Sequence, residues 1–178
     1  GEKANIHSMV DAVYKYKVGY ITENRKEEGL ILPFSVQDNM TLLTLKDLTG
    51  AAGKLSETKM KEETQSMIDR FKIKTPELST KIETLSGGNQ QKVSIGKWLL
   101  AGCDILIIDE PTVGVDVGAK RQIHEIIWKL AKEEGKSIIL ISSDMTEMIT
   151  LARRILVFKE FKINGEINGL NDHVCEYA

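Results

Sequence analysis

Two adjacent carboxylates that follow a short apolar run are the residues best suited to chemistry in this sequence. Residues 105–108 are Ile-Leu-Ile-Ile, and Asp109 and Glu110 come directly after them. Because side chains alternate along a strand, the two carboxylates would point in different directions. One could hold Mg²⁺ through water while the other reaches an attacking water, which are the two roles that nucleotide hydrolysis needs. An acidic strand end that only meets solvent would show the same pattern.

A glycine-containing stretch upstream is a candidate phosphate site. It comprises Leu85, Ser86, Gly87, Gly88, Asn89, Gln90, Gln91 and Lys92, at the expected start of a helix over residues 88–100. Backbone N–H groups at a helix start bind anions, and glycines let a phosphate approach closely. Taken alone, a flexible turn with Ser86 as N-cap explains the stretch at least as well. The acidic strand one helix later favours the phosphate site.

The second half of the chain predicts alternating strands and helices. Residues 105–108 and 138–141 are continuous apolar runs, typical of parallel strands that are buried on both faces. Asp116 is a suitable N-cap for the helix between them, and residues 144–152 predict a further helix. A strand over residues 155–158 follows. The terminal hairpin turn is expected either at 164–165 or near 159–161.

The first half predicts a strand and a helical region. Residues 18–21 are β-rich and run into the polar cluster 23–26. Ser56 could cap a helix that residues 75–76 end. The apolar residues expected on one face of that helix are Met60, Met67, Ile68 and Phe71.

The composition is that of an ordinary globular protein. With 24 basic and 26 acidic residues the net charge is -2, so nothing in the overall charge favours nucleic acid or an anionic membrane as a partner. The two cysteines form no disulfide or metal-binding pattern, and Cys103 is expected to be a small core residue. No apolar stretch approaches the ~18 residues of a membrane span.

The motifs together resemble one protein family. Residues 85–92 resemble the signature motif of ABC (ATP-binding cassette) proteins, residues 105–110 resemble their Walker B strand, and residues 112–120 resemble the D-loop. Residues 23–30 fit the Glu-Asp-Arg-Lys stretch that one subfamily has where other ABC proteins have the Q-loop. The sequence as a whole, over residues 1–167, is similar to the second nucleotide-binding domain of bacterial ribose/galactose/xylose-type sugar importers.

The resemblance implies a role for each matching residue. Asp109 would bind Mg²⁺ through water, Glu110 would be the general base or water-positioning carboxylate, and Glu23 would stand near the metal and couple to the membrane subunit. Asp116 would communicate across the interface with a partner domain. The implied ATP-binding residues are Leu85, Ser86, Gly87, Gly88, Asn89, Gln90 and Asp116, of which Ser86, Gly87, Gly88 and Gln90 would touch the γ-phosphate of a nucleotide held mainly by that partner.

Two departures from the general ABC pattern matter for activity. Ser143 is expected at the catalytic position where most ABC proteins have a switch histidine, as it is in the resembled subfamily, and serine cannot supply an imidazole. His124 is expected at the surface or in a partner contact and does not substitute for it. No Gly-x-x-x-x-Gly-Lys-Ser/Thr loop occurs in the sequence. By resemblance that loop would lie upstream of Gly1, so the isolated chain is expected to be inactive and to expose an apolar surface or dimerise.

The expected fold is therefore an α/β, P-loop NTPase-like ABC ATPase core with a helical subdomain, truncated at the N-terminus. Its expected divisions are residues 1–33 and 102–168 for the core, 34–101 for the helical subdomain with the signature motif, and 169–178 for a tail. The implied cofactors are ATP and Mg²⁺. The implied partners are a second nucleotide-binding domain, transmembrane permease subunits and, indirectly, a periplasmic or extracellular sugar-binding protein, at the cytoplasmic face of a bacterial membrane.

Two other functions fit the same residues. The chain could be a non-catalytic interaction module that supplies signature residues in trans, which the missing phosphate loop and Ser143 favour. It could also be a soluble ABC ATPase of DNA repair or translation. Repair-type members insert a long coiled coil before the signature motif, and no sustained heptads occur here. Translation-type members join two domains through a charged linker, which this sequence also lacks.

Overall fold

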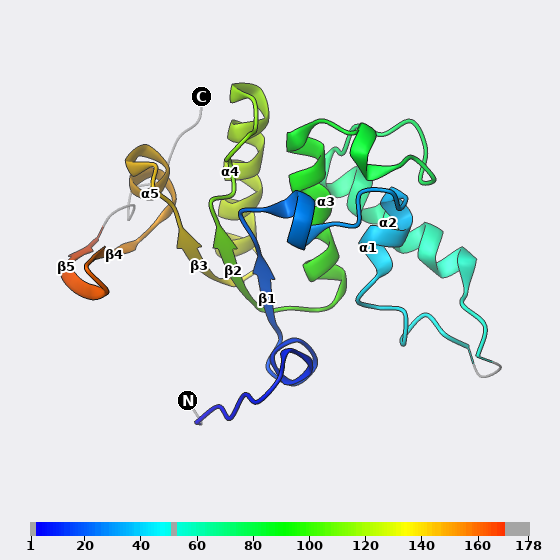
Figure 1. Ribbon diagram of the computed structural model, residues 1–178, viewed down its shortest axis with the longest axis horizontal. Helices are drawn as coiled ribbons and strands as arrows, with labels where there is room; N and C mark the ends of the chain where they lie inside the picture. The colour runs from blue at the N-terminus through cyan, green and yellow to red at the C-terminus, as the bar shows by residue number, and fades with distance from the viewer. Residues whose placement is uncertain (1–2, 51–52, 170–178) are drawn as a thin grey trace.

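Parallel strands with helices between them form the centre of the protein (Figure 1), as the sequence predicts. The computed structural model describes residues 3–50 and 53–169. The helices are α1 (Val36–Thr41), α2 (Glu57–Phe71), α3 (Gly87–Leu100), α4 (Val117–Lys132) and α5 (Met145–Leu151). The strands are β1 (Val18–Ile21), β2 (Ile105–Asp109), β3 (Ser137–Ile141), β4 (Arg154–Lys159) and β5 (Lys162–Asn168). Short helical turns occur at η1 (Asp11–Lys15), η2 (Arg25–Gly29) and η3 (Ile82–Thr84).

The central sheet has the strand order β1-β2-β3, and both pairings are parallel. In the register of the strands Ile21 lies opposite Ile108, and Asp109 lies opposite Ile141. The carboxyl ends of the strands therefore meet at one edge of the sheet. In parallel α/β sheets this edge is where ligands bind, and here it carries both candidate carboxylates.

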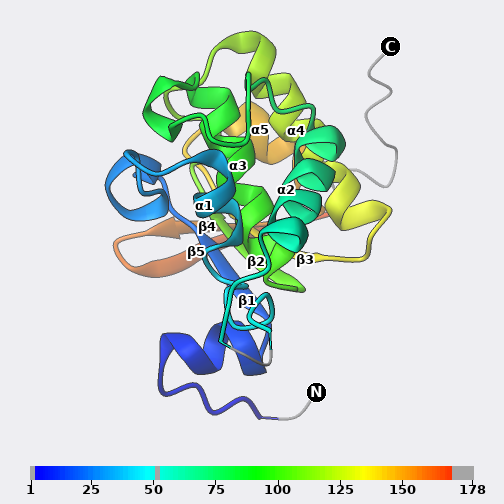
Figure 2. The same cartoon turned by 90° about the vertical axis from the view of Figure 1, so that its right-hand side faces the viewer.

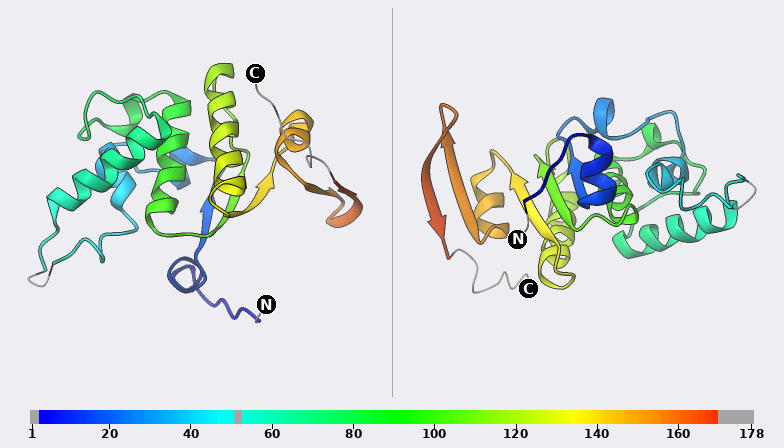
Figure 3. Two further views of the ribbon diagram at one scale, coloured as in Figure 1. Left: turned by 180° about the vertical axis from the view of Figure 1, so that it is seen from behind. Right: turned by 90° about the horizontal axis from the view of Figure 1, so that it is seen from below.

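Helices α3 and α4 cover one face of this sheet, as the view from behind shows (Figure 3). On that face Leu106 and Ile108 are completely buried. On the opposite face Tyr20, Ile139 and Ile141 are 45%, 55% and 46% exposed. The prediction that residues 105–108 and 138–141 are buried on both faces is therefore wrong, because no element of the described residues covers this second face.

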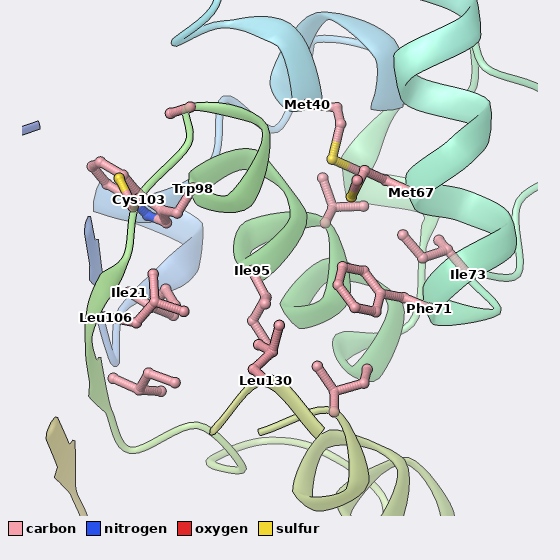
Figure 4. Close-up of a cluster of buried hydrophobic side chains, with 14 of the residues drawn as sticks. Ile21, Met40, Met67, Phe71, Ile73, Ile95, Trp98, Cys103, Leu106 and Leu130 are labelled. Carbon is pink, nitrogen blue, oxygen red and sulfur yellow. The ribbon is translucent and has the colours of Figure 1, made fainter. Parts of the chain in front are cut away.

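Helices α1 and α2 pack against the side of α3 that faces away from the sheet (Figure 2). Helix α3 lies between two groups of apolar side chains (Figure 4). One group comes from the strands and the end of α3, and the other comes from α1 and α2, with Ile95 between them. Since α3 begins with the candidate phosphate-binding loop, the core fixes that loop relative to the sheet.

Helix α2 confirms the predicted cap and the predicted apolar face. The Ser56 side chain accepts a hydrogen bond from the Lys59 N–H. The buried residues of α2 include all four that the sequence placed on one face: Met60, Met67, Ile68 and Phe71. The helix ends earlier than predicted, because Lys72 adopts a left-handed conformation with φ 50° and closes it at Phe71.

Strands β4 and β5 form an antiparallel hairpin apart from the central sheet (Figure 1). Its turn lies at Glu160 and Phe161, whose φ angles of 51° and 60° are those of a type I′ turn. The alternative near residues 159–161 is thus confirmed, and the one at 164–165 is wrong, because those residues lie within β5. A groove of about 840 Å³ is lined by residues of both β3 and β4. The two strands are not paired with each other in the part of the chain that the structure describes.

Two further sequence expectations concern the core and the membrane. Cys103 is completely buried and has a free thiol, as predicted. In the described residues no helix is both long and apolar enough to cross a bilayer. The division of the chain at residues 34, 102 and 169 stays a prediction, and most of the expected tail, residues 170–178, lies outside the described residues.

Candidate functional site

Asp109 is the last residue of β2 and stands half-buried at the carboxyl edge of the sheet. Its Oδ2 accepts a hydrogen bond of 2.9 Å from the hydroxyl of Tyr20 on the neighbouring strand. This hydrogen bond and partial burial raise the pKa of Tyr20 above its ordinary value, so the hydroxyl stays a donor at neutral pH. Tyr20 thereby orients the carboxylate without neutralising it.

Glu110 follows immediately and is anchored to the end of β3. Its backbone has a φ of 44°, the left-handed region that non-glycine residues rarely adopt and that often marks functional sites. Its N–H donates to the carbonyl of Ile141 at 2.9 Å, and its Oε1 accepts from the backbone N–H of Ser143 at 2.7 Å. The structure therefore brings Glu110 and Ser143 together, through the backbone of the serine rather than through its hydroxyl.

Glu23 lies beyond the end of β1 and is exposed. Because β1 and β2 are parallel and in register, Glu23 follows the same edge of the sheet that carries Asp109. Mg²⁺ in nucleotide sites is usually held by one or two carboxylates together with phosphate oxygens and water. The half-buried Asp109 carboxylate fits this requirement, and the positions of Glu23 as a metal neighbour and of Asp109 as a ligand stay predictions.

The start of α3 forms the second part of the site. Ser86 is the N-cap, and its exposed hydroxyl oxygen accepts hydrogen bonds from the Asn89 N–H at 3.5 Å and from the Asn89 amide at 3.0 Å. The Gln90 side chain is buried, and its amide donates to the carbonyls of Ile82 and Leu85 at 3.0 and 3.2 Å. Gln90 therefore braces the loop from inside, and its predicted contact with a phosphate stays a prediction.

The stretch between β2 and α4 connects the two parts. Asp116 caps α4 as predicted, since its Oδ1 accepts from the Ala119 N–H at 2.9 Å. Both the turn before Asp116 and the first turn of α4 touch the start of α3: a Cβ on Gly87 would lie 2.6 Å from the carbonyl oxygen of Gly114, and one on Gly88 would lie 2.4 Å from the Cβ of Ala119 in α4. These two glycines are thus required by packing, whatever ligand they face.

A buried polar cluster behind the site was not found from the sequence. His124 is 8% exposed and Glu147 is fully buried, so the expectation of a surface or partner-contact histidine is wrong. The His124 Nε2 lies 2.7 Å from the Glu147 Oε1, which also accepts from the Thr112 hydroxyl at 3.0 Å. The helical phase that His124 shares with the buried Ile127 was the available signal. No sequence signal indicated that Glu147 is buried, because an acidic residue near the start of a helix is usual.

The parallel sheet, the helices that cover one of its faces and the acidic carboxyl edge define an α/β fold whose candidate site lies at the carboxyl ends of the strands. Two solved structures share this fold, each with a TM-score of 0.74 and 21% identity, and each covering 91% of this chain and 68% of the other. One is a dimeric bacterial ABC transporter cassette, and the other is a dimeric ATP-binding cassette in a post-hydrolysis state bound to ADP and Pi.

Residues 2–113 match the family described as ABC transporter, and the chain belongs to this family. It is 48% identical over 167 residues to a "Putative ribose/galactose/methyl galactoside import ATP-binding protein" of Geobacillus kaustophilus, covering 94% of this chain and 33% of the relative. It is 44% identical over 180 residues to the "Ribose import ATP-binding protein RbsA" of Clostridium tetani, covering 99% of this chain and 35% of the relative. The chain thus spans about a third of the length of these curated relatives.

Proposed function

We propose that this chain is part of the ATP-hydrolysing subunit of a bacterial ABC importer for a ribose- or galactose-type sugar. The observation that carries the proposal is the pair of adjacent carboxylates at the end of β2, one oriented by Tyr20 and the other by the amide of Ser143. Relatives that resemble almost the whole chain are named as import ATP-binding proteins for these sugars, which supports the choice of substrate class.

The two carboxylates divide the chemistry between them. Asp109 would hold Mg²⁺ through water, and the ion would neutralise charge that develops on the phosphates. Glu110 orients the attacking water and accepts its proton, because the hydrogen bond to Ser143 leaves the second carboxylate oxygen available. The exposed hydroxyl of Ser86 and the N–H groups at the start of α3 bind the γ-phosphate of a nucleotide held mainly by a partner domain.

In the proposal, a phosphate-binding loop from outside residues 1–178 completes the site that contains Asp109 and Glu110. The sequence contains no such loop, and the curated relatives are about three times longer than the part of them that this chain matches. The open face of the sheet and the groove between β3 and β4 offer a place where a further strand and helix could pack. In this arrangement the chain works with a second nucleotide-binding domain and permease subunits at the cytoplasmic face of the membrane, and with an external sugar-binding protein indirectly.

Substitution of Glu110 by Gln in the natural full-length protein tests the proposal. Loss of the proton acceptor should lower kcat for Mg-ATP hydrolysis by about 10²–10⁴-fold and leave the Kd for Mg-ATP unchanged, because Gln keeps the size of the side chain. The control is Glu62→Gln, the same chemical change at an exposed position of α2. Hydrolysis that is equal in the two variants would contradict a catalytic Glu110.

That contrary result would favour the second candidate, an interaction module that supplies signature residues to a site on its partner. One observation supports this candidate: Ser143 stands where most ABC proteins have a switch histidine, and serine has no imidazole. In that case Ser86→Arg should abolish hydrolysis by the assembled transporter while Glu110→Gln leaves it intact.

A further inference from the structure

Arg25 is a buried cation that the site described above does not use. It begins the turn η2, just beyond β1, and its side chain is 6% exposed. None of the ion pairs found among residues 3–50 and 53–169 includes it. Instead, its Nη1 donates to the carbonyl of Val113 at 2.8 Å and its Nη2 donates to the carbonyl of Gly114 at 3.2 Å.

Packing alone does not explain a guanidinium at this position. A buried charge without an ionic partner destabilises a fold more than an apolar side chain of similar volume would. Burial accordingly lowers the pKa of Arg25, although an arginine stays protonated at neutral pH. The planar fork of donors is what an apolar side chain lacks, and it binds two consecutive carbonyl groups.

Those two carbonyls belong to the turn that links the acidic strand end to α4. The Val113 N–H donates to the carbonyl of Glu110 at 3.3 Å, so the turn is continuous with the candidate base. On its other side the Gly114 carbonyl faces Gly87, where a Cβ would lie 2.7 Å from the Arg25 Nη2 and 2.6 Å from that carbonyl oxygen. One guanidinium thus contacts the loop after β1, the turn after β2 and the start of α3.

We propose that Arg25 is a positioning residue that fixes the turn at Val113 and Gly114 against the start of α3 and thereby holds Glu110 in place. The catalytic part of this inference rests on the proposed function. Arg25 touches no reacting atom, so its effect passes through the turn. Because a displacement of about 1 Å at a catalytic group can cost about 100-fold in rate, loosening this turn should be visible in turnover.

The test uses Arg25→Met, Arg25→Lys and the control Lys26→Met in the natural full-length protein. Methionine fills much of the same volume without a donor, and lysine keeps the charge but donates from a single nitrogen. Lys26 is the neighbouring cation and is exposed. Hydrogen exchange at residues 112–117 should become at least about 10-fold faster in Arg25→Met, with an intermediate value in Arg25→Lys and no change in Lys26→Met.

The comparison of kcat with KM distinguishes a positioning role in turnover from a merely structural role. In Arg25→Met we expect kcat for Mg-ATP hydrolysis to fall at least about 10-fold while KM changes less than about 3-fold, with partial recovery in Arg25→Lys. Unchanged exchange at residues 112–117 in Arg25→Met would overturn the proposed contact, and faster exchange with unchanged kcat would overturn its catalytic role. If the unsubstituted protein does not hydrolyse ATP, the proposed function fails, and the exchange measurement still decides whether Arg25 holds the turn.

Discussion

Replacement of Gly88 by Ala should destabilise the chain because the new methyl group has no room between α3 and α4. A methyl group on residue 88 would lie 2.4 Å from the Cβ of Ala119, whereas carbon atoms in contact are about 3.5–4.0 Å apart. The helices would have to separate by about 1 Å, and such overpacking costs about 1–3 kcal/mol. Since Ala is favoured over Gly in a helix by up to about 1 kcal/mol, we expect a net loss of about 1–2 kcal/mol in the free energy of unfolding.

A second substitution should rescue the first. Ala119→Gly alone should cost about 0.5–1 kcal/mol, because it places a glycine in a helix. In Gly88→Ala/Ala119→Gly the new methyl group would meet the Val115 Cγ1 at 3.5 Å and the residue 119 Cα at 3.8 Å, which are ordinary contacts. The double variant should therefore be about as stable as the unsubstituted chain, with a coupling energy of about 1.5–3 kcal/mol between the two sites.

The measurement is urea unfolding followed by the fluorescence of the two tryptophans, Trp98 and Trp128. Gly118→Ala is the matched control, because Gly118 occupies the second position of α4 as Gly88 does in α3. Its Cβ would meet the Asp116 Oδ1 at 3.4 Å, so this variant should be unchanged or slightly more stable. Additive effects of Gly88→Ala and Ala119→Gly in the double variant would refute the reasoning.

Two further predictions concern pH and the open face of the sheet. Burial by itself would raise the pKa of Glu147, but hydrogen bonds from His124 and other neighbours outweigh it and hold the pKa below its ordinary value. The stability that Glu147 contributes should therefore be fully present above the ordinary glutamate pKa, and it should be lost as the pH falls through the lower pKa of the folded state. Glu147→Gln should therefore weaken the dependence of urea unfolding on acid pH. An identical dependence in both proteins would contradict this. The isolated chain should bind a hydrophobic dye, and Ile139→Thr on the open face should reduce this fluorescence more than the control Val117→Thr, which replaces a residue that is 87% exposed at the start of α4. A dye signal that the two substitutions lower equally would argue against the open face as the binding surface.

The sequence by itself determined the family and most of the elements, although the helix α1 was not predicted. Helix caps and apolar periodicity are local signals, so Ser56 and Asp116 were predicted as N-caps and Ser86 was considered as one in the alternative to a phosphate site, and all three accept the capping hydrogen bond. The α/β fold followed from alternating strands and helices, and the match to the ABC transporter family confirms what the motifs implied. Motifs could be recognised because nucleotide chemistry restricts residue types at fixed spacings along the chain.

Tertiary structure alone decided what each side chain faces. Strand periodicity could not show that one side of the sheet is open, because burial depends on what packs there, and Ile139 is an apolar residue left exposed. His124 is buried against Glu147, 23 positions further along the chain. Arg25 is buried against the turn at Val113, which lies 88 positions further along. The helical phase of His124 indicated that it is buried, but the partners of His124 and of Arg25 carry no local sequence signal, since they depend on how separate elements come together. The roles proposed for these buried polar groups therefore follow from the fold, whereas the roles proposed for the carboxylates follow from the motif.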